Sequence, residues 1–361
     1  MERRRVALVV VRSVAVILGA LVVTWFALPS PIGSLPWIPS PAPALDGPYK
    51  MNELLTSATW QWPEAVGAED TAADADGRLY SGLSDGRVVR LEPGGATTTI
   101  VQTGGRPLGL QFSKADGLLY VCDTDKGLLA VDVAKKTFIV VTDTAEGDAF
   151  SFTNNLAIDS AGRVYFTDAS SVWRKHQYTE DLLDQRPTGR VMRYDPRTKE
   201  TTVLVRELSF ANGVALMPDE RSLIVAETGR YRLWRVWLEG DKKNLKEVLI
   251  ENLPGFPDNI DVSPRGTVWV AMASTRKRLL DIVHPHPFFK DTLASLPKAV
   301  RPKGVRWGFV LEVDGEGRPL RSLQDPSGNV VWSVTSARER NGVLHLGTLD
   351  DAGVATVRIP W

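Results

Sequence analysis

A motif that repeats six times along residues 74–359 constrains the fold more than any other feature of this sequence. Each copy has short runs of alternating apolar and polar residues joined by turns, and the first copy reads DADGRLYSGLSDGRVVRL (74–91). Asp-Gly between such runs is a strong signal for a β-hairpin. One equivalent turn residue marks each copy: Gly77, Gly117, Gly162, Glu220, Gly266 and Gly342.

The spacing of these markers sets the number of repeating units. Successive markers lie 40, 45, 58, 46 and 76 residues apart. A propeller blade of four strands takes about 40 to 45 residues, so the two long intervals predict insertions at about 173–187 and 276–306. The sequence therefore predicts an all-β fold, a six-bladed β-propeller over residues 49–361.

The insertion at 276–306 interrupts the fifth blade and mixes apolar with basic residues. Its roughly helical spacing predicts a helical insertion. Such a segment either caps one face of the propeller or touches a bilayer. A packed surface helix is an equally good interpretation.

The N-terminal 28 residues differ in kind from the rest. Arginines at positions 3 to 5 precede residues 6–28, which are apolar except for Arg12 and a few small polar residues. This run makes about 35 Å of helix, enough to cross a bilayer. We predict an uncleaved transmembrane signal anchor at residues 1–28, with the N-terminus cytoplasmic and the propeller on the non-cytoplasmic side of the membrane. The alternative is a cleaved signal peptide, but the first Ala-x-Ala, at 42–44, lies far downstream.

Residues 29–48 contain seven prolines. This density predicts a stiff, polyproline-like stalk, with the folded domain beginning near Tyr49.

Charge and cysteine content exclude several classes of function. The 43 basic and 43 acidic residues cancel, and no long basic run follows residue 5. Nucleic acid is therefore not an expected partner. Cys122 is the single cysteine, which excludes an internal disulfide and a thiolate metal cluster; we expect it to be buried.

Polar residues stand at one matched position in four of the six copies. Glu69, Asn154, Asn212 and Asp258 each lie eight residues before their turn marker. Because equivalent positions of a repeat occupy equivalent places, we expect all four side chains at one end of the innermost strands, around the central channel. The corresponding positions of the second and sixth copies fall near Leu108 and Thr335, which carry no charge.

Two carboxylates and two carboxamides that converge on an axis need a partner, since unpaired buried carboxylates are costly. Oxygen ligands without histidine or thiolate favour Ca2+, with magnesium or manganese behind it. The alternative is that these are ordinary turn residues, because Asn and Asp are common where strands begin and end.

Four strings carry a resemblance to a known family: GAEDTAADADGRLYSG, TNNLAIDSAGRVYFTD, FANGVALMPDERSLIVAETGRYRLWR and LPGFPDNIDVSPRGTVWVA. They resemble the strictosidine synthase-like branch of the superfamily that contains gluconolactonases, senescence marker protein and paraoxonases. The resemblance implies a six-bladed propeller with an axial calcium. Its implied catalytic metal ligands are Glu69, Asn154, Asn212 and Asp258, with Asn259 beside them.

This sequence also differs from the paraoxonases and strictosidine synthases of that superfamily at several functional positions. Asp70 matches a ligand of a second calcium in paraoxonases, but Asn155 stands where that family has an aspartate. The histidine pair of paraoxonases is replaced by Leu108 and, approximately, Asp123. Thr335 stands where strictosidine synthases use a glutamate, so an amine and aldehyde condensation is not expected.

Two classes of function follow. The first is a membrane-anchored, calcium-dependent hydrolase of a small-molecule ester or lactone, in which Asp258 is the catalytic base or nucleophile. The second is a non-catalytic propeller that binds a ligand or protein and holds a structural calcium.

Other motifs point away from catalysis. Residues 82–86 match G-x-S-x-G around Ser84, but that motif needs a strand entering a helix and here it falls in a hairpin turn. His176, His284 and His286 lie in the insertions and His345 in a predicted strand. His284 and His286 either reach the channel mouth from a cap or serve packing and surface roles.

Overall fold

The computed structural model describes Val16, residues 30–349 and residues 351–360. The predicted transmembrane segment lies outside the described residues, apart from Val16. Within the described part of the chain, no helix has both the length and the apolar character needed to cross a membrane.

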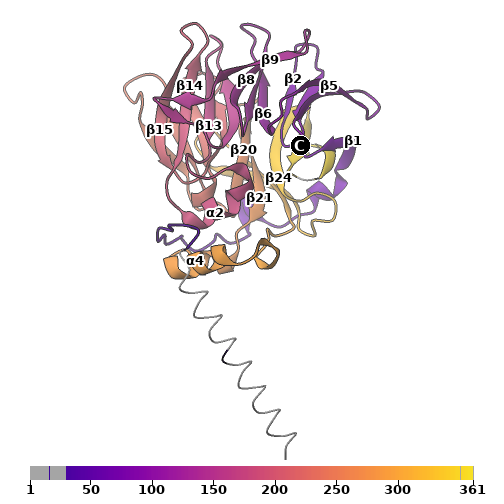
Figure 1. Ribbon diagram of the computed structural model, residues 1–361. Helices are drawn as coiled ribbons and strands as arrows, with labels where there is room; N and C mark the ends of the chain where they lie inside the picture. Colours follow the sequence, from indigo (N-terminus) through magenta and orange to yellow (C-terminus); the bar gives the residue numbers. More distant parts are fainter. Residues whose placement is uncertain (1–15, 17–29, 350, 361) are drawn as a thin grey trace, which may run out of the picture.

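Six four-stranded antiparallel sheets form the blades of a propeller (Figure 1), as the repeat predicts. Blade one contains β2 (Thr71–Ala73), β3 (Leu79–Gly82), β4 (Arg87–Leu91) and β5 (Thr97–Gln102). Blade two contains β6 (Pro107–Phe112), β7 (Leu119–Asp123), β8 (Gly127–Asp132) and β9 (Thr137–Thr142). Blade three contains β12 (Thr153–Ile158), β13 (Val164–Asp168), β14 (Gly189–Asp195) and β15 (Glu200–Leu208). A two-stranded ribbon of β10 (Thr144–Ala145) and β11 (Asp148–Ala149) connects blades two and three.

The remaining blades complete the ring. Blade four contains β16 (Ala211–Leu216), β17 (Ser222–Glu227), β18 (Arg232–Trp237) and β19 (Lys246–Ile250). Blade five contains β20 (Gly255–Val262), β21 (Val268–Thr275), β22 (Gly308–Val313) and β23 (Pro319–Asp325). Blade six contains β24 (Val334–Arg340), β25 (Val343–Thr348), β26 (Ala352–Arg358) and the N-terminal strand β1 (Thr59–Val66).

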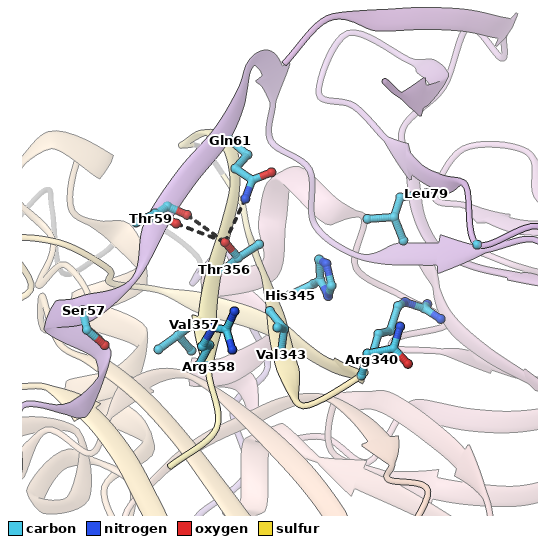
Figure 2. Close-up of a pocket in the computed structure, with 12 residues that line it drawn as sticks. Ser57, Thr59, Gln61, Leu79, Arg340, Val343, His345, Thr356, Val357 and Arg358 are labelled. Carbon is cyan, nitrogen blue, oxygen red and sulfur yellow. Dashed lines mark hydrogen bonds between the residues drawn. The ribbon is translucent and has the colours of Figure 1, made fainter. Parts of the chain in front are cut away.

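Strand β1 closes the ring because it is the outermost strand of the last blade. It pairs antiparallel with β26, with Thr59 opposite Thr356. Figure 2 shows the side chains at this closure, where Gln61 Nε2 donates a hydrogen bond of 3.1 Å to Thr356 Oγ1. The first and last parts of the propeller are thereby held in one sheet, which ties the two ends of the ring together.

Apolar side chains that alternate along the strands pack between adjacent blades. One such cluster joins blades one and two: Tyr80 and Val88 of blade one pack against Leu110, Val121 and Leu129 of blade two. Cys122 faces the other side of blade two and is buried in the next cluster, against blade three. The expected burial of this thiol is therefore confirmed.

Short helices interrupt blades three and five. Residues 173–187 contain η3 (Lys175–Gln177) and α2 (Tyr178–Asp184), and residues 276–306 contain α3 (Arg278–Val283), α4 (Pro287–Ser295) and η5 (Lys298–Val300). Helices α2 and α4 contact each other and lie together at one end of the propeller (Figure 1). They form a cap over that end.

Residues 30–48 are not a stalk that stands away from the domain, and the folded unit begins before Tyr49. The Leu35 N–H donates to the Asp184 carbonyl at 2.8 Å, and the Trp37 N–H donates to the His284 carbonyl at 3.0 Å. Ile32 is buried against side chains of the cap. The prolines keep this segment extended, while the N–H groups of Leu35 and Trp37 and the side chain of Ile32 find partners on the inserted segments.

Candidate metal centre

A β-bulge recurs at the same place in the innermost strand of four blades. The register breaks between Pro107 and Leu110, Thr153 and Leu156, Ala211 and Val214, and Pro257 and Ile260. A bulge interrupts the alternation of side chains and changes where they point. The bulged pairs are Leu108–Gly109, Asn154–Asn155, Asn212–Gly213 and Asp258–Asn259.

Two of these bulges need glycine because neighbouring inner strands approach closely there. A Cβ on Gly213 would lie 2.6 Å from the Asp258 carbonyl oxygen, and one on Gly109 would lie 2.7 Å from Asn155 Cα. No side chain fits at such distances. The glycines therefore bring the bulges of adjacent blades into contact around the channel.

The four residues at the matched offset line a single cavity at the capped end of the propeller. Glu69, in the loop before β2, lies with Asn154, Asn212 and Asp258 in the wall of a cavity of about 740 Å³. Leu108 and Thr335, at the corresponding positions of the other two blades, line the same cavity. The repeat therefore predicted this grouping correctly.

Four side-chain oxygens at this place are buried and have no hydrogen-bond partner: Glu69 Oε2, Asn154 Oδ1, Asn212 Oδ1 and Asn259 Oδ1. Asn259 is held beside Glu69, because its Nδ2 donates to Glu69 Oε1 at 2.8 Å. Buried polar atoms are normally paired, and oxygen ligands of this kind are those that calcium takes. The residues present thus fit the cation that the family resemblance implies.

The donor set has few charged groups. Across the described residues, no three His, Cys, Asp or Glu side chains cluster as a metal-binding group. Glu69 and Asp258 supply the two carboxylates, and the other candidate ligands are amide oxygens.

Burial dominates the electrostatics of both carboxylates. It raises the pKa of Glu69 well above its ordinary value, and the nearby Asp258 and Asp70 carboxylates raise it further. Burial also raises the pKa of Asp258, to about 7, against the opposing effect of a hydrogen bond with Asn212. Two buried carboxylates this close are costly as anions unless a positive charge joins them.

Arg338 supplies positive charge at Asp70. Its Nε and Nη2 donate to Asp70 Oδ1 and Oδ2 at 2.8 and 2.6 Å, while Nη1 donates to Asp261 Oδ1 at 2.8 Å. The family resemblance assigns Asp70 to a second calcium. Here the Arg338 guanidinium engages both Asp70 oxygens instead. Asn155 adds a weaker bond of 3.3 Å to Asp70 Oδ2.

Other sequence-level candidates lie elsewhere. Asp123 is buried, and its Oδ1 accepts the Arg106 N–H at 3.2 Å, but it does not line the cavity. Ser84 is exposed in the turn between β3 and β4, so the strand-to-helix geometry of a hydrolase elbow is absent there. His345 lines a different cavity at the ring closure (Figure 2), which contains none of the predicted ligands.

Of the two interpretations of His284 and His286, the structure supports packing and surface roles. His176 lines the cavity, whereas neither His284 nor His286 does. His284 is instead buried against Trp37, with the two ring centroids 5.1 Å apart.

The cap contributes cavity residues that sequence reasoning did not assign. Apolar parts of the cavity wall come from Leu182 of α2, Leu280 of α3 and Leu293 of α4. Lys277 and Arg301 also line the cavity. The helical spacing of Leu280 and Leu293 was visible in the sequence, but the spacing alone did not show which side of each helix faces the channel.

Two family models match the chain: strictosidine synthase over residues 154–242, and strictosidine synthase-like, N-terminal, over residues 47–91. An adipocyte plasma membrane-associated protein from Rattus norvegicus is 36% identical over 355 residues, covering 92% of this chain and 93% of its own. Protein strictosidine synthase-like 3 from Arabidopsis thaliana is 33% identical over 346 residues, covering 86% and 87%.

Solved structures share the fold at low sequence identity. A gluconolactonase from Xanthomonas campestris has a TM-score of 0.62 and 16% identity, covering 92% of this chain and 99% of its own. A luciferin-regenerating enzyme has a TM-score of 0.57 and 14% identity, covering 83% and 92%.

Proposed function

Because this chain belongs to the strictosidine synthase-like family, together with the adipocyte plasma membrane-associated proteins, we propose that it is a membrane-anchored, calcium-dependent hydrolase of esters or lactones. The observation that carries this proposal is the group of buried, unpartnered oxygens in the wall of the cavity. One solved structure of the same fold is a gluconolactonase; that likeness supports the fold, and the reaction class rests on the chemistry of the cavity.

Glu69, Asn154, Asn212 and Asp258 would hold the calcium, with Asn259 beside them as a further candidate ligand that also positions Glu69 through its hydrogen bond. When bound, calcium supplies Lewis-acid polarisation of the ester or lactone oxygen. Asp258 accepts a proton from the attacking water as the water oxygen bonds to the acyl carbon. Asp258 then returns this proton to the leaving alkoxide as the acyl–oxygen bond breaks. Glu69 is a ligand only.

The cavity walls suit a substrate with a substantial apolar part. Phe152, Phe210 and Phe256 line the cavity together with the leucines of the cap. Such walls orient a substrate by excluding water from its apolar portion. A strictosidine-type condensation is not part of the proposal, because Thr335 offers no carboxylate at its position.

Anchoring is the second half of the proposal. Relatives of this chain are named plasma membrane-associated proteins, and residues 6–28 have the length and apolarity of a signal anchor. We place the N-terminus in the cytoplasm and the propeller on the other side of the membrane, because the arginines precede the apolar run. The full-length chain should stay in membranes during carbonate washing, and protease should reach the propeller only from the non-cytoplasmic side.

The test of catalysis is turnover of a panel of lactones and aryl esters by the full-length chain in calcium. Asp258→Asn should abolish turnover while circular dichroism and melting in excess calcium show a folded propeller. Leu108→Met is the matched control, because Leu108 lines the same cavity without offering an oxygen. Hydrolysis that survives in Asp258→Asn contradicts the assigned base.

A non-catalytic binding propeller is the second candidate. The observation that favours it is that Leu108 stands at the position where paraoxonases carry one histidine of their catalytic pair. Absence of turnover across the panel, together with retained calcium binding by the wild type, would select this candidate.

A further inference from the structure

Helices α3 and α4 expose large apolar side chains that a soluble surface normally hides. Phe288 is 60% exposed, Phe289 53%, Ile282 55% and Leu279 47%. The two phenylalanine rings touch edge to face, with centroids 5.5 Å apart. These four residues, named here the α3–α4 face, form a patch of the kind that marks an interaction surface.

The chain itself brings a membrane segment next to this face. Ser34 is tied to α4, because its Oγ donates to Asp291 Oδ1 at 2.6 Å. The apolar run of residues 6–28 ends six residues earlier. At a reach of at most ~3.5 Å per residue, six residues of chain span no more than roughly 20 Å. An anchor formed by residues 6–28 would therefore hold α4 close to the membrane.

The charges around the α3–α4 face suit an anionic surface. Arg278, Lys298 and Lys303 are exposed near it. The acidic residues of the two helices are engaged in local bonds, Asp281 with Arg276 and Asp291 with Ser34. Residues 276–306 contain eight Lys and Arg against two Asp, so the segment is net basic, and basic residues beside exposed aromatic ones favour anionic lipid headgroups.

The same helices carry the cavity wall on their other side. Leu280 lies between the exposed Leu279 and Ile282 in sequence, and it lines the cavity, as does Leu293 of α4. Lys298 and Lys303 also line it. Helices α3 and α4 therefore lie between the cavity and the α3–α4 face.

We propose that the α3–α4 face rests on the non-cytoplasmic surface of the membrane that holds residues 6–28, where it contacts anionic lipid headgroups, with Phe288 and Phe289 at the boundary between headgroups and acyl chains. The capped end of the cavity then faces the lipid surface. This proposal rests on the anchoring half of the proposed function and is independent of catalysis.

The test uses the full-length chain in nanodiscs that contain phosphatidylserine and phosphatidylcholine. Cys122 is the single cysteine and is fully buried, so a cysteine introduced by Phe288→Cys can be labelled selectively with an environment-sensitive fluorophore. Ile139→Cys is the matched control, because Ile139 is 64% exposed on β9, away from the cap. Melting curves establish that both labelled variants fold.

The label at position 288 should show a blue-shifted emission and be quenched several-fold by lipid-borne nitroxide, while the label at position 139 shows neither. Water-like emission at position 288 overturns the proposal. A blue shift without lipid quenching also overturns it, because it indicates a protein partner. Release of the chain by carbonate washing contradicts the anchor and removes the basis of the proposal, whereas loss of turnover alone leaves it intact.

Discussion

The side-chain amide of Asn259 donates a hydrogen bond of 2.8 Å to Glu69 Oε1, joining two residues 190 positions apart in the chain. The bond crosses from blade five to the loop before blade one. It leaves Glu69 Oε2 and Asn259 Oδ1 buried without partners. A cation that binds these oxygens therefore stabilises the closed ring as well as the cavity.

Calcium should stabilise the folded chain. The ligands are gathered only in the folded state, so at a hundredfold excess over the dissociation constant the ion should raise the free energy of unfolding by about 2.7 kcal/mol. Chelation should correspondingly lower the melting temperature of the wild type. Asp258→Asn should respond much less, and a wild-type melting temperature that ignores chelator would rule the shared site out.

Arg338 should be essential for stability. Arg338→Met leaves Asp70 and Asp261 buried or half-buried without their cation, and breaking one side of such a buried pair costs about 3 to 5 kcal/mol. Denaturant unfolding measures this loss. Arg78→Met is the control, because its ion pairs are at the surface. Equal stability of the two variants would contradict the role given to Arg338.

The sequence predicted the ring of blades and the grouping of four matched polar residues around one cavity because both follow from a repeat. Glu69, Asn154, Asn212 and Asp258 occupy equivalent positions, and equivalence alone places them together. The contact between Arg338 and Asp70 was not predictable in this way, since it joins blade six to the loop before blade one through side chains that share no motif.

The segment at residues 30–48 shows a second limit of sequence reasoning. Its prolines correctly indicated an extended backbone without regular structure. Its attachment to the cap depends on individual contacts, such as that of Trp37 with His284, which composition does not encode.

Acid should destabilise the chain partly through His284. Burial lowers its pKa to about 3, assisted by the charges of Lys290, Arg230 and Arg276. The unfolded chain binds this proton below about pH 6.5 and the folded chain does not, so the free energy of unfolding falls as the pH drops from 6.5 towards 3. Between pH 6.5 and pH 5 this loss is about 2 kcal/mol. His284→Phe should remove this loss, as denaturant unfolding at pH 6.5 and pH 5 would show. If the variant loses as much unfolding free energy as the wild type between these two pH values, the assignment to His284 is refuted.

Ser84→Ala should leave any ester hydrolysis within a few-fold of the wild-type rate. Ser84 is exposed in a hairpin turn and lies outside the cavity wall. A fluorophosphonate probe followed by peptide mapping checks this directly. Covalent labelling of Ser84 would contradict this prediction, because it would identify Ser84 as a reactive nucleophile.

The most direct test of the central claim, that Glu69, Asn154, Asn212 and Asp258 bind one calcium ion together, is calorimetric titration of calcium into the chelator-treated, full-length chain. We predict one ion per chain, because Arg338 already engages both oxygens of Asp70. Glu69→Gln and Asp258→Asn should weaken binding more than Asn154→Ala or Asn212→Ala, since each removes a negative charge that attracts the divalent ion. Absence of calcium binding by the wild type, or full affinity in Glu69→Gln, would contradict the account.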